Sequence, residues 1–155
     1  MNTEQLLKHA QAKTPGEIVS EAIIAVEELS VLLDEENTKL KAKEIGFLEE
    51  ALKNKKRAAA KMELAMNLVK FAKEKVDADE TAKANLPRLR DSLARYKETA
   101  RVNLRLLRSA HDTTGDFLQM VAQAVEAKKP KLQTYGKNGA IDSQSGKATL
   151  KGKSI

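Results

Sequence analysis

The stretch that decides the fold is residues 14–40, TPGEIVSEAIIAVEELSVLLDEENTKL. Thr14, Pro15 and Glu17 form a helix start, because threonine caps a helix, proline suits its first turn, and glutamate completes a capping box. Apolar residues then recur at steps of three and four, the spacing of one helix face rather than of a strand. The members of this apolar stripe are Ile18, Ala22, Val26, Leu29, Leu32, Leu33 and Leu40. We therefore predict a helix over residues 15–43 that buries one face.

Two further helices follow from the same kind of pattern. The first stripe loses phase before Gly46, which is the expected terminator of the first helix. A second apolar stripe then predicts a helix over residues 47–76. A third stripe predicts the longest helix, over residues 86–129, with Pro87 in its first turn and Pro130 directly after its end.

The predicted fold is all-α: an antiparallel helical hairpin plus a long third helix, forming a three-helix bundle or coiled coil. The first two helices, each of about 30 residues with a short connection, make the hairpin. The helical domain covers residues 14–129. Residues 130–155 are rich in Lys, Gly, Ser and Asn, and cannot bury enough apolar surface to offset their ordering entropy, so we expect a disordered basic tail. Residues 1–13 are expected to be a loose extension.

The net charge of +6 belongs to the end of the chain. Residues 1–127 hold 21 basic and 21 acidic side chains, whereas residues 128–155 hold seven lysines and one acid. Within the body, residues 17–50 carry ten acids and three lysines, and residues 51–75 carry eight bases and two acids. Opposite charge on consecutive segments favours their packing side by side.

The composition indicates a soluble, cytoplasmic chain. It contains no cysteine, so no disulfide framework is expected. No stretch approaches the roughly 20 apolar residues that span a bilayer, and the N-terminus lacks an apolar run typical of a signal sequence. We therefore expect no membrane insertion.

Motifs that carry catalysis are absent from the sequence. Only His9 and His111 could act as imidazole bases or ligands, and neither has the partner spacing of a di-iron bundle. No Gly-rich phosphate loop and no HExxH motif occur. We expect no enzyme, no catalytic residue, no metal and no cofactor. Residues 109–115, around His111, faintly resemble the phospho-accepting helix of histidine phosphotransfer domains, although Thr114 stands where that family has lysine.

The basic run at residues 53–57 raises the question of nucleic acid. It has no interleaved aromatic residue on which bases could stack, and it is expected to face the acidic first helix. We do not expect a nucleic-acid partner.

Four segments resemble the FlgN family of flagellar export chaperones. Residues 31–40, VLLDEENTKL, are similar to the first-helix signature of a leucine pair, an acidic step and a further leucine. Residues 51–56, ALKNKK, supply the lysine that is conspicuous in the second helix. Residues 132–139, LQTYGKNG, are similar to the Tyr-Gly-x-x-Gly segment after the last helix, and residues 151–155, KGKSI, to the lysine-rich ending. The chain departs from the family in its N-terminal extension and in a longer linker before the lysine-rich end.

The resemblance implies a specific activity. Such chaperones bind the C-terminal segments of hook-associated proteins, which form the hook–filament junction, and deliver them to the cytoplasmic domain of the type III export gate. Client binding is implied for the distal part of the last helix, at Leu107, Phe117, Met120, Val121 and Val125. Docking to the export gate is implied for the tail motif, at Tyr135, Gly136 and Gly139.

Helix lengths draw attention to the same region. The third helix is expected to be about 60 Å long, whereas each hairpin helix is about 45 Å long. If the third helix begins at the same end of the bundle as the hairpin, the last turns of the third helix have nothing to lie against. An apolar stripe there would suit an amphipathic client helix. Two arrangements without an exposed stripe stay open: the third helix shifts in register, or residues 1–13 cover it.

Other functions and states of assembly stay open. The alternative function is a generic coiled-coil adaptor whose basic tail contacts an acidic protein partner. An exposed apolar helix could also form a homodimer when no client is bound.

Overall fold

The computed structural model describes residues 1–127, and the predicted all-α class is confirmed. No strand occurs in this part of the chain. Its helices are α1 Thr3–Gln11, α2 Pro15–Lys41, α3 Leu48–Phe71, α4 Lys73–Ala78 and α5 Glu80–Ala127. The chain forms two compact units, residues 1–107 and the part that begins at Arg108. The predictions for the tail over residues 130–155 lie outside the described residues.

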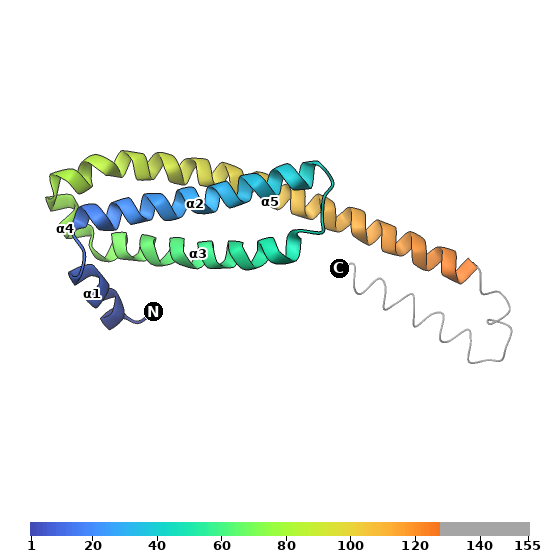
Figure 1. Ribbon diagram of the computed structural model, residues 1–155, viewed down its shortest axis with the longest axis horizontal. Coiled ribbons are helices and arrows are strands. Elements are labelled where there is room, and N and C mark those ends of the chain that lie inside the picture. The colour runs from blue at the N-terminus through green and yellow to red at the C-terminus, as the bar shows by residue number, and fades with distance from the viewer. Residues whose placement is uncertain (128–155) are drawn as a thin grey trace. The chain divides into compact units, whose positions relative to one another are not determined.

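The hairpin of α2 and α3 confirms the charge argument. The two helices run side by side in opposite directions (Figure 1). Lys55 Nζ of α3 lies 2.9 Å from Glu36 Oε1 of α2, and Lys61 Nζ of α3 lies 2.6 Å from Glu28 Oε2. The basic segment therefore packs against the acidic one.

The first turn of α2 is capped as the sequence predicts. The Glu17 N–H donates to Thr14 Oγ1 at 3.2 Å, and the Thr14 N–H donates to Glu17 Oε2 at 2.7 Å. The bond from the Thr14 N–H is the main reason that the pKa of Glu17 lies below its usual value. These two bonds satisfy donors that a helix start otherwise leaves unpaired.

The end of α2 differs from the prediction, because Lys43 and not Gly46 turns the chain. Lys43 has a φ of 63°, in the left-handed region. Its N–H donates to the Leu40 carbonyl, and the Glu44 N–H donates to the Lys39 carbonyl, both at 3.0 Å. This pair of bonds is the Schellman motif, in which glycine usually occupies the left-handed position.

We expect Lys43→Gly to raise the free energy of unfolding by about 1 kcal/mol, because glycine adopts the left-handed conformation without the steric cost that a Cβ imposes. Urea denaturation followed by circular dichroism measures the change. Gly46→Ala is the matched control: Gly46 lies outside the left-handed region and an added Cβ meets nothing within 4 Å. Equal effects at both positions would contradict the assignment of the turn to Lys43.

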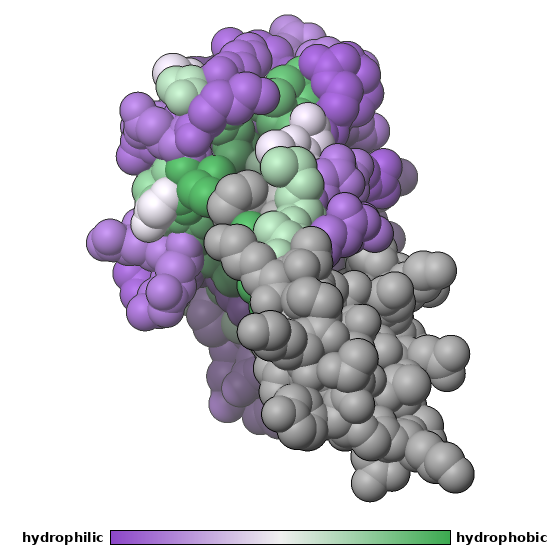
Figure 2. All heavy atoms as spheres, turned by 90° about the vertical axis from the view of Figure 1, so that its right-hand side faces the viewer, coloured by the Kyte–Doolittle hydropathy of each residue, from purple (hydrophilic) through white to green (hydrophobic). Residues whose placement is uncertain are grey.

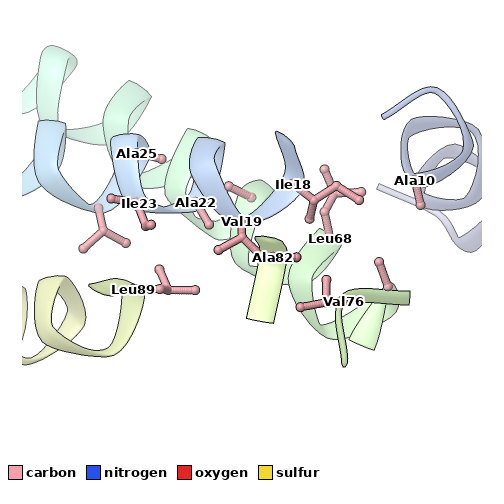
Figure 3. Close-up of a cluster of buried hydrophobic side chains, with 13 residues drawn as sticks. Ala10, Ile18, Val19, Ala22, Ile23, Ala25, Leu68, Val76, Ala82 and Leu89 are labelled. Carbon is pink, nitrogen blue, oxygen red and sulfur yellow. The ribbon is translucent and has the colours of Figure 1, made fainter. Parts of the chain in front are cut away.

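The core of the first unit draws more residues from α2 than from any other helix, and it is built from aliphatic residues and alanines (Figure 3). Val19, Ala22, Val26 and Ala82 have no exposed surface. Alanines let the helix backbones approach, and the larger side chains fill the space between them. The buried cluster comprises Ala10, Ile18, Val19, Ala22, Ile23, Ala25, Val26, Ala65, Leu68, Ala72, Val76, Ala82 and Leu89. On the coloured part of the face shown in Figure 2, hydrophilic residues (purple) lie on the outside and hydrophobic residues (green) gather between them.

The prediction of a loose N-terminus is wrong for residues 3–11, which form α1. The Gln5 N–H donates to Asn2 Oδ1 at 2.9 Å, and the Asn2 N–H donates to Gln5 Oε1 at 3.2 Å, giving a second capping box. Ala10 is buried in the cluster, and Leu6 packs against it. Two apolar contacts and a cap are thus enough to order a segment whose composition is mostly polar.

The predicted bounds of the second and third helices are also wrong. The second helix is divided into α3 and α4, which meet at the buried Ala72. The third begins at Glu80 and not at residue 86, because Asp79 Oδ1 accepts a hydrogen bond from the Ala82 N–H at 2.7 Å and caps the helix. Pro87 consequently lies inside α5. The buried Ala82 and Leu89 on either side of it hold the helix to the core, which offsets the hydrogen bond that proline lacks.

Candidate functional site

The distal part of α5, from Arg108 to Ala127, carries exposed apolar side chains. Leu118 is 57% exposed, Met120 68%, Val121 44% and Val125 47%. Leu118, Val121 and Val125 follow one another at steps of three and four, so they share one face of the helix. We call these three residues the distal apolar face. Large aliphatic side chains gathered on one exposed helix face are typical of a surface that binds another chain.

The distal apolar face shares only Val121 and Val125 with the predicted client-binding residues, whose role stays a prediction. Met120 lies about 100° around the helix from Val121 and further still from Val125, so it does not belong to the distal apolar face. Leu118 does belong and was not among the predicted residues. Its spacing to Val121 and Val125 is the signal that could have found it.

The other predicted client-binding residues are placed as follows. Leu107 is half-buried at the end of the first unit. Phe117 lies within α5, and its side chain lies outside the described part of the structure. The predicted export-gate residues Tyr135, Gly136 and Gly139 also lie outside the described residues.

A polar stretch separates Leu107 from the distal apolar face. Thr113 and Thr114 donate hydrogen bonds through their hydroxyl groups to the carbonyls of Ser109 and Ala110, both at 2.9 Å. Such bonds to the carbonyl four residues back compete with the helix ladder, and Gly115 is a poor helix former. The three residues Thr113, Thr114 and Gly115 therefore add little to the stability of the helix, unlike residues 118–127, which are rich in alanine, glutamine and other good helix formers.

His111 lies in this polar stretch, on the surface. Its side chain is 76% exposed, and its Nδ1 lies 3.7 Å from Asp112 Oδ1. The phosphotransfer alternative rests on the sequence pattern around His111 and stays a prediction.

A buried polar layer, which the sequence did not reveal, lies in the first unit. Asn103 Nδ2 of α5 donates to Glu36 Oε1 at 2.9 Å and to Asn37 Oδ1 at 3.0 Å, both on α2. Asn37 Nδ2 donates to the Thr99 carbonyl at 3.3 Å, and Lys55 of α3 completes the set at Glu36. Glu36, Asn37 and Asn103 are each no more than 5% exposed. The layer joins three helices through hydrogen bonds, and it fixes how α5 lies along α2.

Two further observations bear on chemistry. In the part of the chain that the structure describes, no three histidine, aspartate or glutamate side chains come together as they would around a metal ion. Among the same residues, no helix combines the length and the apolar content that crossing a bilayer requires.

No protein-family model matches the chain, and neither a curated protein nor a solved structure does. The resemblance to the FlgN family is therefore carried by the quoted segments within residues 26–62 and 130–155.

Proposed function

We propose that the chain is an export chaperone similar to the FlgN family. In this proposal it holds the C-terminal segment of a hook-associated protein on the distal apolar face and delivers it to the export gate. The observation that carries the proposal is the distal apolar face itself: Leu118, Val121 and Val125, aligned on one side of a helix and each about half exposed.

The chemistry of this face fits an amphipathic helix of a client. Apolar anchors at steps of three and four are what a partner helix meets when ridges pack into grooves. Burying a Val or Leu side chain fully contributes about 1.5–3 kcal/mol, from which the cost of association is subtracted. In this proposal the chaperone binds its client stoichiometrically, and no covalent bond is made or broken.

Delivery to the gate is assigned to Tyr135, with Gly136 and Gly139, by the resemblance alone. An aromatic ring in a basic segment makes a suitable anchor once a partner buries it. The division of labour separates client binding on α5 from gate docking on the tail motif.

Titration calorimetry with peptides from the C-terminal segments of hook-associated proteins tests the proposal. We expect saturable one-to-one binding with a negative heat-capacity change, because apolar surface is buried and the client folds on contact. The control is each peptide with its apolar anchors replaced by serine, which should not bind. Equal binding of intact and replaced peptides would favour the adaptor alternative and overturn the chaperone proposal.

A further inference from the structure

A second surface, on the first unit, carries charge that the neutral total of residues 1–127 conceals. Residues 83–105 hold seven basic side chains and two acidic ones. Two of the basic side chains pair with Glu27 of α2: Nη2 of Arg88 lies 3.5 Å from Glu27 Oε1, and Nη2 of Arg95 lies 3.8 Å from it. The other five are exposed, and we call them the basic ridge: Lys83, Arg90, Lys97, Arg101 and Arg105.

The basic ridge is a narrow, straight stripe. Steps of seven, seven, four and four residues keep its members within about 80° of one another around the helix and spread them over about 33 Å. Arg101 donates to Glu98 at 2.7 and 3.0 Å, and this hydrogen bonding is the main reason that the pKa of Glu98 is lowered. Among the residues that the structure describes, the other four members make no ion pair within 4.0 Å.

We propose that the basic ridge docks an acidic α-helix of a partner protein, with carboxylates at the seven-residue spacing of Lys83, Arg90 and Lys97. Two helices lying side by side can keep such a charge pattern paired along their whole length. Between the charges, Ala94 leaves room for a close approach, and Leu104, which is 50% exposed, offers one apolar contact. The inference is independent of the client-binding role of the distal apolar face.

The width of the ridge favours a helix over a flat anionic membrane. The exposed acids Asp91 and Glu98 border the ridge on one side. A planar anionic surface meets a broad sector of the helix and would bring lipid phosphates against these carboxylates, whereas a partner helix meets only the stripe. Tyr96, the aromatic residue between Lys83 and Arg105, lies at least about 100° around the helix from each ridge member and packs against the core cluster, so the ridge offers no aromatic anchor for a bilayer interface.

The geometry also disfavours nucleic acid. A duplex presents its phosphates along helical groove walls, so a straight stripe of this length meets them at few points. Single strands are held by stacking on aromatic rings, which the ridge lacks. Of the anionic partners considered, carboxylates along one face of an α-helix are those whose spacing matches the spacing of the basic ridge.

The test uses the full chain and a labelled synthetic helical peptide of about 22 residues, a length that matches the ridge at 1.5 Å per residue. The peptide carries glutamates along one face, and its control has the same composition with the glutamates spread around the helix. Fluorescence anisotropy at low salt should show at least tenfold tighter binding of the one-faced peptide, and the difference should shrink as salt screens the charges. The variant Lys83→Glu, Arg90→Glu, Lys97→Glu should lose this binding by at least tenfold.

The matched control reverses three exposed charges on α3, with Lys53→Glu, Lys56→Glu and Arg57→Glu, and should retain binding. Circular dichroism verifies folding, and glutamine at the three ridge positions replaces glutamate if the reversal unfolds the chain. If the α3 control lost as much affinity for the one-faced peptide as the ridge variant, the loss would be explained by net charge alone, and the proposal would be overturned. Tighter binding to duplex DNA, or to vesicles containing anionic lipid, than to the one-faced peptide would also overturn it. Client-peptide binding should be the same in ridge variants and native chain, so the two proposals fail separately.

Discussion

Replacing Asn103 by leucine is expected to lower the free energy of unfolding by about 3 kcal/mol, although the change makes the interior more apolar. The Asn103 amide donates to both Glu36 and Asn37, whose side chains are 4% and 5% exposed. Without it, a buried carboxylate keeps only Lys55 as a partner, and a buried amide oxygen loses its donor. Urea denaturation of the full chain measures the loss.

A triple variant that removes the whole polar layer distinguishes the free-energy cost of lost hydrogen bonds from the cost of altered packing. Combining Asn103→Leu with Glu36→Met and Asn37→Leu leaves none of these three buried positions with an unpaired polar group. Lys55, whose side chain is 22% exposed, can extend to water. We expect the triple variant to recover about 2 kcal/mol or more relative to the single one. A triple variant less stable than Asn103→Leu would show that the polar layer stabilises the bundle in its own right.

The sequence predicted those parts of the fold that local chemistry decides. The start of α2 depends on Thr14 and Glu17, three residues apart, and both predicted hydrogen bonds form. The pairing of α2 with α3 follows from opposite charge on adjacent segments. Other ends depend on tertiary contacts that no local pattern reveals: α1 is held by burial of Ala10, and α5 continues through Pro87 because residues beyond it are packed.

The sequence alone outlines the two surfaces proposed as sites only in part, for reasons of helix geometry and charge. Steps of four residues drift around a helix by about 40° each, so a stripe drawn from Phe117 through Val121 to Val125 misses Leu118. Met120 is next to Val121 in the chain, but the two side chains lie on different faces of the helix. The basic ridge was concealed because residues 76–127 hold eight basic and eight acidic side chains, so their summed charge is zero. Asn103 follows an apolar spacing, and its burial becomes evident only with Glu36 and Asn37 beside it.

Introducing aspartate at both Leu118 and Val121 is expected to weaken client binding about 1,000-fold, the largest effect on binding that we predict. Two apolar anchors are lost and two carboxylates must be desolvated, which together cost about 4 kcal/mol. Both side chains are exposed in the free chain, so the free energy of unfolding of the first unit should change little. Titration calorimetry with the client peptide measures the first effect, and urea denaturation the second.

Met120→Asp is the matched control for this pair, because Met120 is the most exposed large apolar side chain of the distal part of α5 that the structure describes, and it lies on another face. Hydrophobicity alone would make Met120 the stronger anchor, whereas helix geometry excludes it from a partner that packs on Leu118, Val121 and Val125. We therefore expect Met120→Asp to bind the client within about threefold of the native chain, a difference of under 1 kcal/mol. Equal losses at Met120 and at Leu118 with Val121 would mean that the client surrounds the helix. Loss of helical circular dichroism in the double variant would mean instead that the distal apolar face stabilises the chain's own fold.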